Sequence, residues 1–208
     1  IKTNQKGVDL ETKRKVKPPL ASKENQYKFG ITVLFPNTRM LGKDSKSDEQ
    51  MRFLFVRSTN NVLGIRNYLE REIDKRLYYG YLKVIVLGKD LVNDPGLVRE
   101  TLGSLFRDKD VPQNAFLLVS ETTARDTLNT MPLVNPITGI HLANIENSAM
   151  IYGRIIDTPL SYVVNNFINS NCSLISRVEP GIETLKVAGA AVLKNYKFVG
   201  WIDEEHLA

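Results

Sequence analysis

Cysteine and histidine are scarce in this sequence. It contains one cysteine, Cys172, and two histidines, His141 and His206, which lie 65 positions apart. A single cysteine excludes a disulfide bond within the chain and any metal site built from several thiolates. The two histidines have no partner at the short spacing that zinc sites use. We therefore expect no metal centre and no cofactor, and we interpret Cys172 as a small buried residue in a strand.

Long apolar runs and recognisable targeting segments are also absent. No stretch reaches the ~18 apolar residues that a membrane-spanning helix needs. The segment between Asp126 and Glu146 holds no acidic residue, lysine or arginine, but its asparagines and prolines, among them Pro132 and Pro136, exclude a membrane span. The chain begins with Ile1 and shows no signal peptide, so we expect a trimmed or processed piece of a longer protein.

The net charge of +5 is concentrated at the amino-terminal end. Residues 1–28 hold eight of the 28 basic residues and three of the 23 acidic ones, so the rest of the chain carries 20 of each sign. A nucleic-acid-binding domain should carry its basic patch on the folded surface. The neutral body argues against that class and predicts no nucleic-acid partner.

Four of these basic residues form one short cluster followed by two prolines. We call it the basic loop, and it consists of Lys13, Arg14, Lys15 and Lys17. The functional interpretation is attraction to anionic lipid headgroups, worth about 1 kcal/mol per basic residue close to the surface. An ordinary solvated loop is the competing interpretation. A nucleic-acid arm ranks third, because no aromatic side chains are interleaved for base stacking.

The segment Tyr81–Gly88 has the pattern of a strand that is buried on both faces. It holds two valines and an isoleucine among its aliphatic residues and ends in glycine. Ala115–Ser120 repeats the pattern, and helical periodicity precedes and separates the two segments. Helices alternating with such strands predict a parallel or mixed sheet covered by helices. We expect Tyr81–Gly88 to be the strand around which the fold is organised.

Further elements are predicted from alternation and from capping residues. Residues 27–35 and 52–57 form an expected antiparallel pair of strands, followed by a helix whose apolar stripe runs from Val62 to Leu77. The residues expected to cap helices are Ser58 or Thr59, Asp94 before Pro95, Thr122, and Thr158 before Pro159. A helix from His141 to Tyr152 and strands over 172–178, 184–193 and 198–202 complete the prediction, with a tight turn at Asn195-Tyr196.

These elements predict an α/β to α+β fold. We expect a helix-flanked mixed β-sheet domain over residues 1–130, followed by a smaller helix-plus-hairpin region of α+β type over residues 131–208. The change of texture after Asn129, where prolines and a glycine accumulate, sets the expected boundary.

Signatures of catalysis and nucleotide binding are missing. No GxGxxG or GxxxxGK[ST] follows a strand, and no GxSxG elbow is present. Parallel sheets bind ligands beyond the carboxyl ends of their strands, where this sequence places Asp90 and Glu121. The alternative function is therefore a soluble α/β enzyme or small-ligand-binding domain that uses these strand ends. A deep pocket around a buried Asp90 or Glu121 would favour it.

The last part of the chain resembles a known family. Residues 187–194 (Val-Ala-Gly-Ala-Ala-Val-Leu-Lys) and 197–203 (Lys-Phe-Val-Gly-Trp-Ile-Asp) are similar to two strands of the Ger(x)C family, the C subunits of bacterial spore germination nutrient receptors. Leu193 stands where that family usually has phenylalanine. Tyr81–Gly88 is similar to the family's first core strand, and Gly7-Val8-Asp9 to its early Gly-Ile-Asp. The similarity runs in order through about residues 50–208.

The resemblance implies a function that the residue patterns alone do not. Such proteins are lipoproteins, tethered through a lipidated cysteine upstream of Ile1 to the outer face of the spore inner membrane. They act with two integral-membrane subunits of A and B type, and they carry a C-terminal domain that is absent here. No enzymatic activity and no catalytic residues are implied. We therefore predict a non-enzymatic, membrane-tethered scaffold subunit of a germinant receptor.

Overall fold

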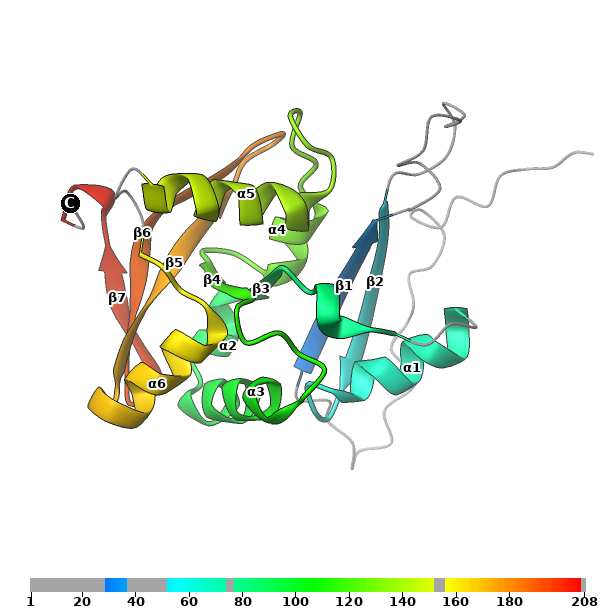
Figure 1. Ribbon diagram of the computed structural model, residues 1–208, viewed down its shortest axis with the longest axis horizontal. Helices are drawn as coiled ribbons and strands as arrows, with labels where there is room; N and C mark the ends of the chain where they lie inside the picture. Colours follow the sequence, from blue (N-terminus) through cyan, green and yellow to red (C-terminus); the bar gives the residue numbers. More distant parts are fainter. Residues whose placement is uncertain (1–28, 37–51, 74–76, 152–155, 207–208) are drawn as a thin grey trace, which may run out of the picture.

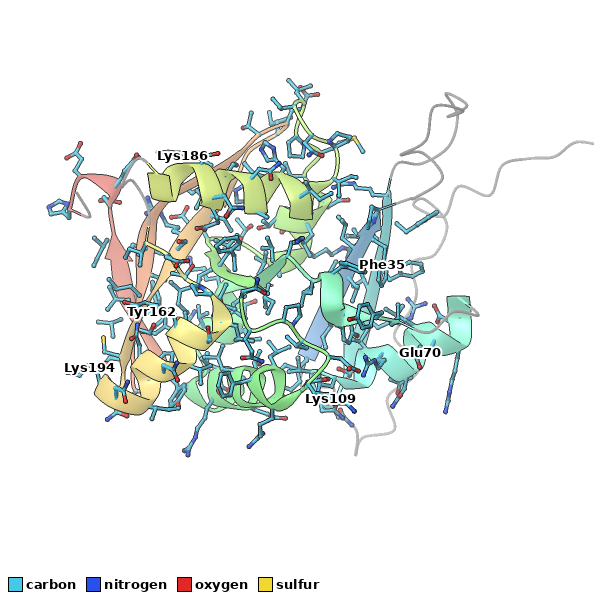
Figure 2. The ribbon with its side chains drawn as sticks, viewed as in Figure 1. Phe35, Glu70, Lys109, Tyr162, Lys186 and Lys194 are labelled. Carbon is cyan, nitrogen blue, oxygen red and sulfur yellow. The ribbon has the colours of Figure 1, made fainter. Side chains whose placement is uncertain are left out.

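The computed structural model describes residues 29–36, 52–73, 77–151 and 156–206. The first two strands, β1 (Phe29–Pro36) and β2 (Arg52–Thr59), pair antiparallel as a separate two-stranded sheet. Alternation in β1 directs Ile31, Val33 and Phe35 to one face, as the sequence predicted, and Phe35 is labelled in Figure 2.

Helix α1 (Gly64–Ile73) packs on that apolar face. Its buried Ile65 and Leu69 meet the β1 and β2 side chains together with Leu77, which lies beyond the helix end. The expected cap at Ser58 or Thr59 is wrong. Thr59 is the last residue of β2, and its hydroxyl donates to the Asn61 carbonyl at 2.6 Å, so it shapes the turn before the helix begins.

A second, five-stranded sheet forms the main body. Its order follows the chain: β3 (Val84–Leu87), β4 (Phe116–Ser120), β5 (Cys172–Pro180), β6 (Leu185–Lys194) and β7 (Lys197–Ile202). The pairings β3–β4 and β4–β5 are parallel, and β5–β6 and β6–β7 are antiparallel. The predicted mixed sheet is therefore confirmed. The sheet draws strands from both sides of residue 130, with β3 and β4 before it and the other strands after it.

The segment expected to organise the fold lies at the margin of this sheet. Only Val84–Leu87 is strand, while Tyr79–Tyr81 forms the 3-10 turn η2. Within the described sheet β3 has one neighbour, and β4 and β5 occupy the interior. A continuous apolar run reports burial but not position within a sheet. In β4, four of the five residues are buried, whereas in β3 only Leu87 is.

Helices cover both faces of the five-stranded sheet, as Figure 1 shows. Helices α2 (Lys89–Val92), α3 (Pro95–Arg107) and α6 (Leu160–Ser170) bury one face, where Leu117 and Phe167 belong to the larger apolar cluster. Helices α4 (Ala124–Asn129) and α5 (Thr138–Ile151) cover the other, where Leu142 packs on Leu118 and Val178. No helix in the part of the chain that the structure describes is long and apolar enough to cross a membrane.

Of the other predicted helix caps, one agrees with the structure and two do not. Asp94 accepts hydrogen bonds from Gly96 N and Leu97 N at the start of α3, as expected. The cap of α4 is Thr123 rather than Thr122, because the Thr123 hydroxyl accepts from Asp126 N at 3.0 Å. Thr158 does not cap α6: its hydroxyl donates to the Leu117 carbonyl at 2.8 Å and so fastens the helix entry to β4.

The carboxyl-terminal hairpin has the predicted turn. Asn195 and Tyr196 have φ values of 50° and 65° between β6 and β7, the conformation of a type I′ hairpin turn. Tyr196 stacks on Phe167 of α6 with ring centroids 4.3 Å apart. The acidic residues after β7 begin the single turn η3 (Glu204–His206).

Candidate functional site

The carboxyl ends of the parallel strands, where a ligand site was considered, form one edge of the sheet. The loops after β3 and β4 lie side by side there, because Lys89 N donates to the Thr122 carbonyl at 2.9 Å. Asp90 is exposed on α2, and the Glu121 side chain is 39% exposed. Neither carboxyl group is buried, so the feature that would have favoured a ligand site is missing at both positions.

Arg177 of β5 occupies the centre of this edge. Its guanidinium lies 2.9 Å from Glu179, 3.3 Å from Asp203 and 3.4 Å from Glu121, and its side chain is only 12% exposed. Its Nε donates to the Ala188 carbonyl at 2.9 Å. We call this group the Arg177 clamp, since one side chain joins β6 to the carboxyl ends of β4, β5 and β7.

The sequence motif that carries the family resemblance builds the clamp. The Arg177 guanidinium lies over the ring of Trp201 in β7, and the distance from Arg177 Cζ to the ring centroid is 5.6 Å. Gly189 of β6 has φ of 73°, a conformation that disfavours side chains, and a Cβ there would overlap the Ile202 carbonyl oxygen. The small residue therefore lets β6 and the end of β7 approach closely enough for Asp203 to reach Arg177.

The contacts of the Arg177 clamp stabilise the fold. A guanidinium offers five donors in a fixed fork, and here carboxylates and a carbonyl oxygen use them. Glu121, the strand-end carboxylate considered for ligand binding, serves as one of these acceptors. The arrangement holds strand ends together and leaves that carboxylate engaged with the protein itself.

Two surface hollows lie elsewhere. One, of about 420 Å³, runs between α3 and α6 beside Arg99, Arg107 and Tyr196. The other, of about 720 Å³, lies between the loop after α4 and the β5–β6 turn. Neither hollow is lined by Asp90 or Glu121.

A buried carboxyl group on the opposite face of the sheet escaped the sequence analysis. Glu146 of α5 is 0% exposed, and neither of its oxygens has a hydrogen-bond partner. Burial raises the pKa of Glu146 to about 8; the nearby Ser176 hydroxyl lowers this pKa, and the charge of Asp157 raises it. The Ser176 hydroxyl donates instead to the Ile156 carbonyl at 3.1 Å. Glu146 is therefore protonated at neutral pH.

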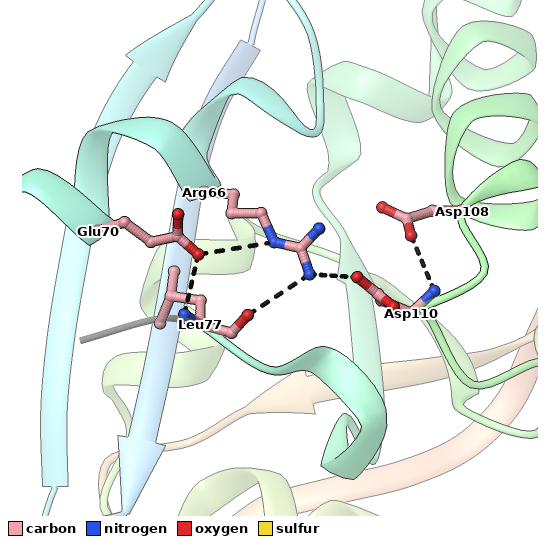
Figure 3. A network of polar contacts seen from close by, with 5 residues as sticks. All are labelled: Arg66, Glu70, Leu77, Asp108 and Asp110. Carbon is pink, nitrogen blue, oxygen red and sulfur yellow. Dashed lines mark hydrogen bonds and ion pairs between the residues drawn. The ribbon is translucent and has the colours of Figure 1, made fainter.

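A second polar group that the sequence did not reveal connects α1 to the loop before β4 (Figure 3). Arg66 Nη2 lies 2.7 Å from Asp110 Oδ2, and Arg66 Nε lies 3.9 Å from Glu70. Glu70 in turn accepts a hydrogen bond from Leu77 N at 3.0 Å. The Asp110 contact raises the pKa of Arg66, and burial raises the pKa of Tyr79, whose ring lies 4.8 Å from the guanidinium. This network holds the two sheets together.

The residues considered for metal binding lie apart from one another. His141 is on α5, where burial lowers its pKa; His206 is exposed in η3, and Cys172 is half-buried at the start of β5. Among the described residues no group of three or more histidine, cysteine or acidic side chains is arranged to hold a metal ion. The basic loop falls in residues 1–28, outside the described part.

Comparison with known proteins gives the family. A model of the spore germination protein N-terminal domain matches residues 7–180. Among solved structures, the chain is similar to the one described as the crystal structure of the GerBC protein, with 17% identity and a TM-score of 0.48 over 88% of this chain and 51% of that one. This chain thus spans about half the length of that protein. No curated protein sequence matches it. Since the family model covers most of the chain, the protein belongs to the spore germination protein N-terminal domain family, the germinant receptor C-subunit family that its carboxyl-terminal hairpin resembles.

Proposed function

We propose that this chain is the N-terminal part of a non-enzymatic scaffold subunit in a spore germinant receptor. The full protein is tethered by a lipid anchor to the outer face of the spore inner membrane. There it works through contacts with integral-membrane subunits of A and B type. The mechanism is protein–protein contact that transmits or permits the germination signal.

One observation supports this proposal above the others: the Arg177 clamp engages the sheet edge at which α/β proteins usually bind small molecules. Glu121 is held by Arg177 at 3.4 Å, and Asp203 from the end of β7 is held at 3.3 Å. A sheet edge used in this way favours a rigid platform over a catalytic cleft. The family match over residues 7–180 supplies the biological setting.

The basic loop supports a position near the membrane. Its four cations would each gain about 1 kcal/mol close to anionic headgroups. A lipid anchor upstream of the loop would keep these cations in the neighbourhood of the bilayer, and the attraction acts within a Debye length, about 8 Å at physiological ionic strength, of the bilayer surface.

Affinity purification of the full-length protein from spore membranes tests the proposal. We expect the A- and B-type subunits to be recovered with it in detergent. Replacing the cysteine expected to carry the lipid with alanine should release the protein from the membrane fraction, while a tagged wild-type protein remains bound. Recovery without either integral-membrane subunit, from membranes in which both are present, would contradict the proposal.

A further inference from the structure

Four large apolar side chains protrude from one end of the molecule. We call them the apolar tip: Met131 is 50% exposed, Leu133 76%, Val134 89% and Ile182 96%. The first three come from the loop between α4 and α5, and Ile182 comes from the turn between β5 and β6. Figure 1 shows these two segments together at the top of the view, and Leu133 N donates to the Glu183 carbonyl at 3.3 Å.

The loop that carries the apolar tip is firmly held at its base. Arg52 of β2 donates to the carbonyls of Leu128 and Thr130 at 2.9 Å and of Asn129 at 2.5 Å. The Thr138 hydroxyl donates to the Thr130 carbonyl at 2.7 Å. These contacts fix both ends of the loop, so its apolar side chains are presented to solvent by the fold. Contiguous exposed apolar residues of this kind mark interaction sites.

The hollow of about 720 Å³ lies within the apolar tip. Its apolar lining is Met131, Pro132, Leu133, Pro136 and Ile182, and its polar lining is Asp126, Asn129, Thr130 and Glu183. Two of these residues carry carboxylates and none carries a positive charge. Asp126 and Glu183 are both exposed. The Asp126 carboxylate accepts a hydrogen bond from the Thr123 hydroxyl at 2.7 Å. The side chains that line the hollow are therefore apolar, uncharged polar or acidic, and the Arg52 guanidinium contacts the lining residues at the backbone carbonyls of Asn129 and Thr130.

We propose that the apolar tip docks a protein segment in which a lysine or arginine stands beside a large apolar side chain. The apolar side chain would enter the hollow, and the cation would lie between Asp126 and Glu183. This inference rests on the proposed function in one respect, since it assigns the segment to another subunit of the same receptor.

The charge of the hollow decides against two other occupants. An anionic lipid surface would repel both carboxylates, and it has no shaped projection to fill a hollow. A second copy of this chain docking through the same surface would place two acidic patches in one interface, because a twofold interface repeats the same patch on both sides. Like charges brought together in an interface oppose association. A basic, partly apolar protein segment meets neither obstacle.

Photo-crosslinking in spores carrying the full-length protein tests this inference. p-Benzoylphenylalanine is placed at Val134 or at Ile182, and at Val199 of β7, which is 64% exposed, as the matched control. The crosslinked peptide is identified by mass spectrometry. We expect capture at Val134 and Ile182, well above the control, of a receptor-subunit segment with a cation beside a large apolar residue.

Charge reversal then distinguishes specific docking from non-specific hydrophobic association. Glu183→Lys should lower the crosslinking yield at Val134 about tenfold, and Leu133→Ser should do the same, in the range that central interface residues show. Glu205→Lys, the same change at an exposed position in η3, should leave the yield unaltered. Unchanged melting temperatures for the purified variants establish that each is folded.

The outcomes divide cleanly. Crosslinks to lipid, to a second copy of this chain, or no stronger than at Val199 would overturn the docking surface. So would a protein crosslink that ignores Glu183→Lys. Capture of a segment with the stated chemistry from a protein outside the receptor would keep the docking surface and overturn the assignment of that segment to another receptor subunit. Recovery of the intact receptor with no contact at the apolar tip would do the reverse.

Discussion

Glu146 makes the stability of this protein depend on pH in an unusual direction. An ordinary paired carboxyl group has a lowered pKa in the folded state, whereas that of Glu146 is raised from 4.5 to about 8. Between these two values the folded state binds more protons than the unfolded state, so folding stability must fall as pH rises. The stability contribution is complete below pH 4.5 and is lost progressively up to about pH 8.

The size of the effect follows from linkage. Each pH unit inside the window costs about 1.4 kcal/mol, less near its ends where titration is incomplete. Raising the pH from 5.5 to 8 should therefore lower the free energy of unfolding by about 3 kcal/mol through Glu146 alone. The physical reason is that Glu146 is fully buried and no group in the described part of the chain is hydrogen-bonded to its carboxyl oxygens, so desolvation by burial opposes ionisation.

The assay is urea denaturation of wild type and Glu146→Gln across this pH range. Glutamine keeps the shape and cannot ionise, so the stability of the variant relative to wild type should grow by about 3 kcal/mol from pH 5.5 to 8. Taking the difference removes titrations common to both proteins, including that of His141, whose lowered pKa acts in the opposite direction. Parallel stability curves for the two proteins would refute the reasoning.

Three further predictions concern other parts of the molecule. Gly189→Ala should destabilise the protein by about 2 kcal/mol or more in chemical denaturation, because Gly189 has a φ of 73° and a Cβ there would overlap the Ile202 carbonyl oxygen. Gly139→Ala is the control and should not destabilise the protein, since the space around its Cβ is open. Equal effects of the two substitutions would contradict the close approach of β6 and β7. Arg52→Ala should lower the free energy of unfolding by about 2 kcal/mol, because it removes charged hydrogen bonds to the carbonyls at the end of α4. Arg52→Lys should restore only part of that stability. An unchanged free energy of unfolding in Arg52→Ala would show that these bonds are not needed. Serine at all four positions of the basic loop should weaken binding of the lipid-free protein to anionic liposomes at low salt in a sedimentation assay, and unaltered binding would remove the headgroup role.

The element types were largely predictable, because they depend on local patterns. Periodicity located α3, and Asp94 with Pro95 marked its start, since both signals act within one helical turn. The position of β3 was not predictable in the same way. Its apolar run is equally compatible with an interior or a marginal strand, and the choice depends on partners distant in the chain.

The polar contacts of the interior could not be predicted either, because they too depend on residues that are distant in the chain. Arg177 looks like any charged residue in a strand, and only the cross-strand arrangement brings Glu121 and Asp203 to it. Glu146 lies in a helix whose neighbours give no clear polar face, so nothing in the sequence assigned its side chain to the sheet. The motif residues Gly189 and Trp201 were noticed through family resemblance, and the structure supplies the physical reason for them.

The parallel pairing of β4 with β5 affects how this protein must be made. Leu118 of β4 pairs with Ser176 of β5, 58 residues further along the chain. During synthesis, one edge of β4, in which four of five residues are buried, stays without its neighbour until that later segment has left the ribosome. Folding of the body is therefore delayed by loop closure, while the hairpin of β6 and β7 can form from adjacent residues. Nascent chains that stop before residue 180 should accordingly require chaperones to avoid aggregation.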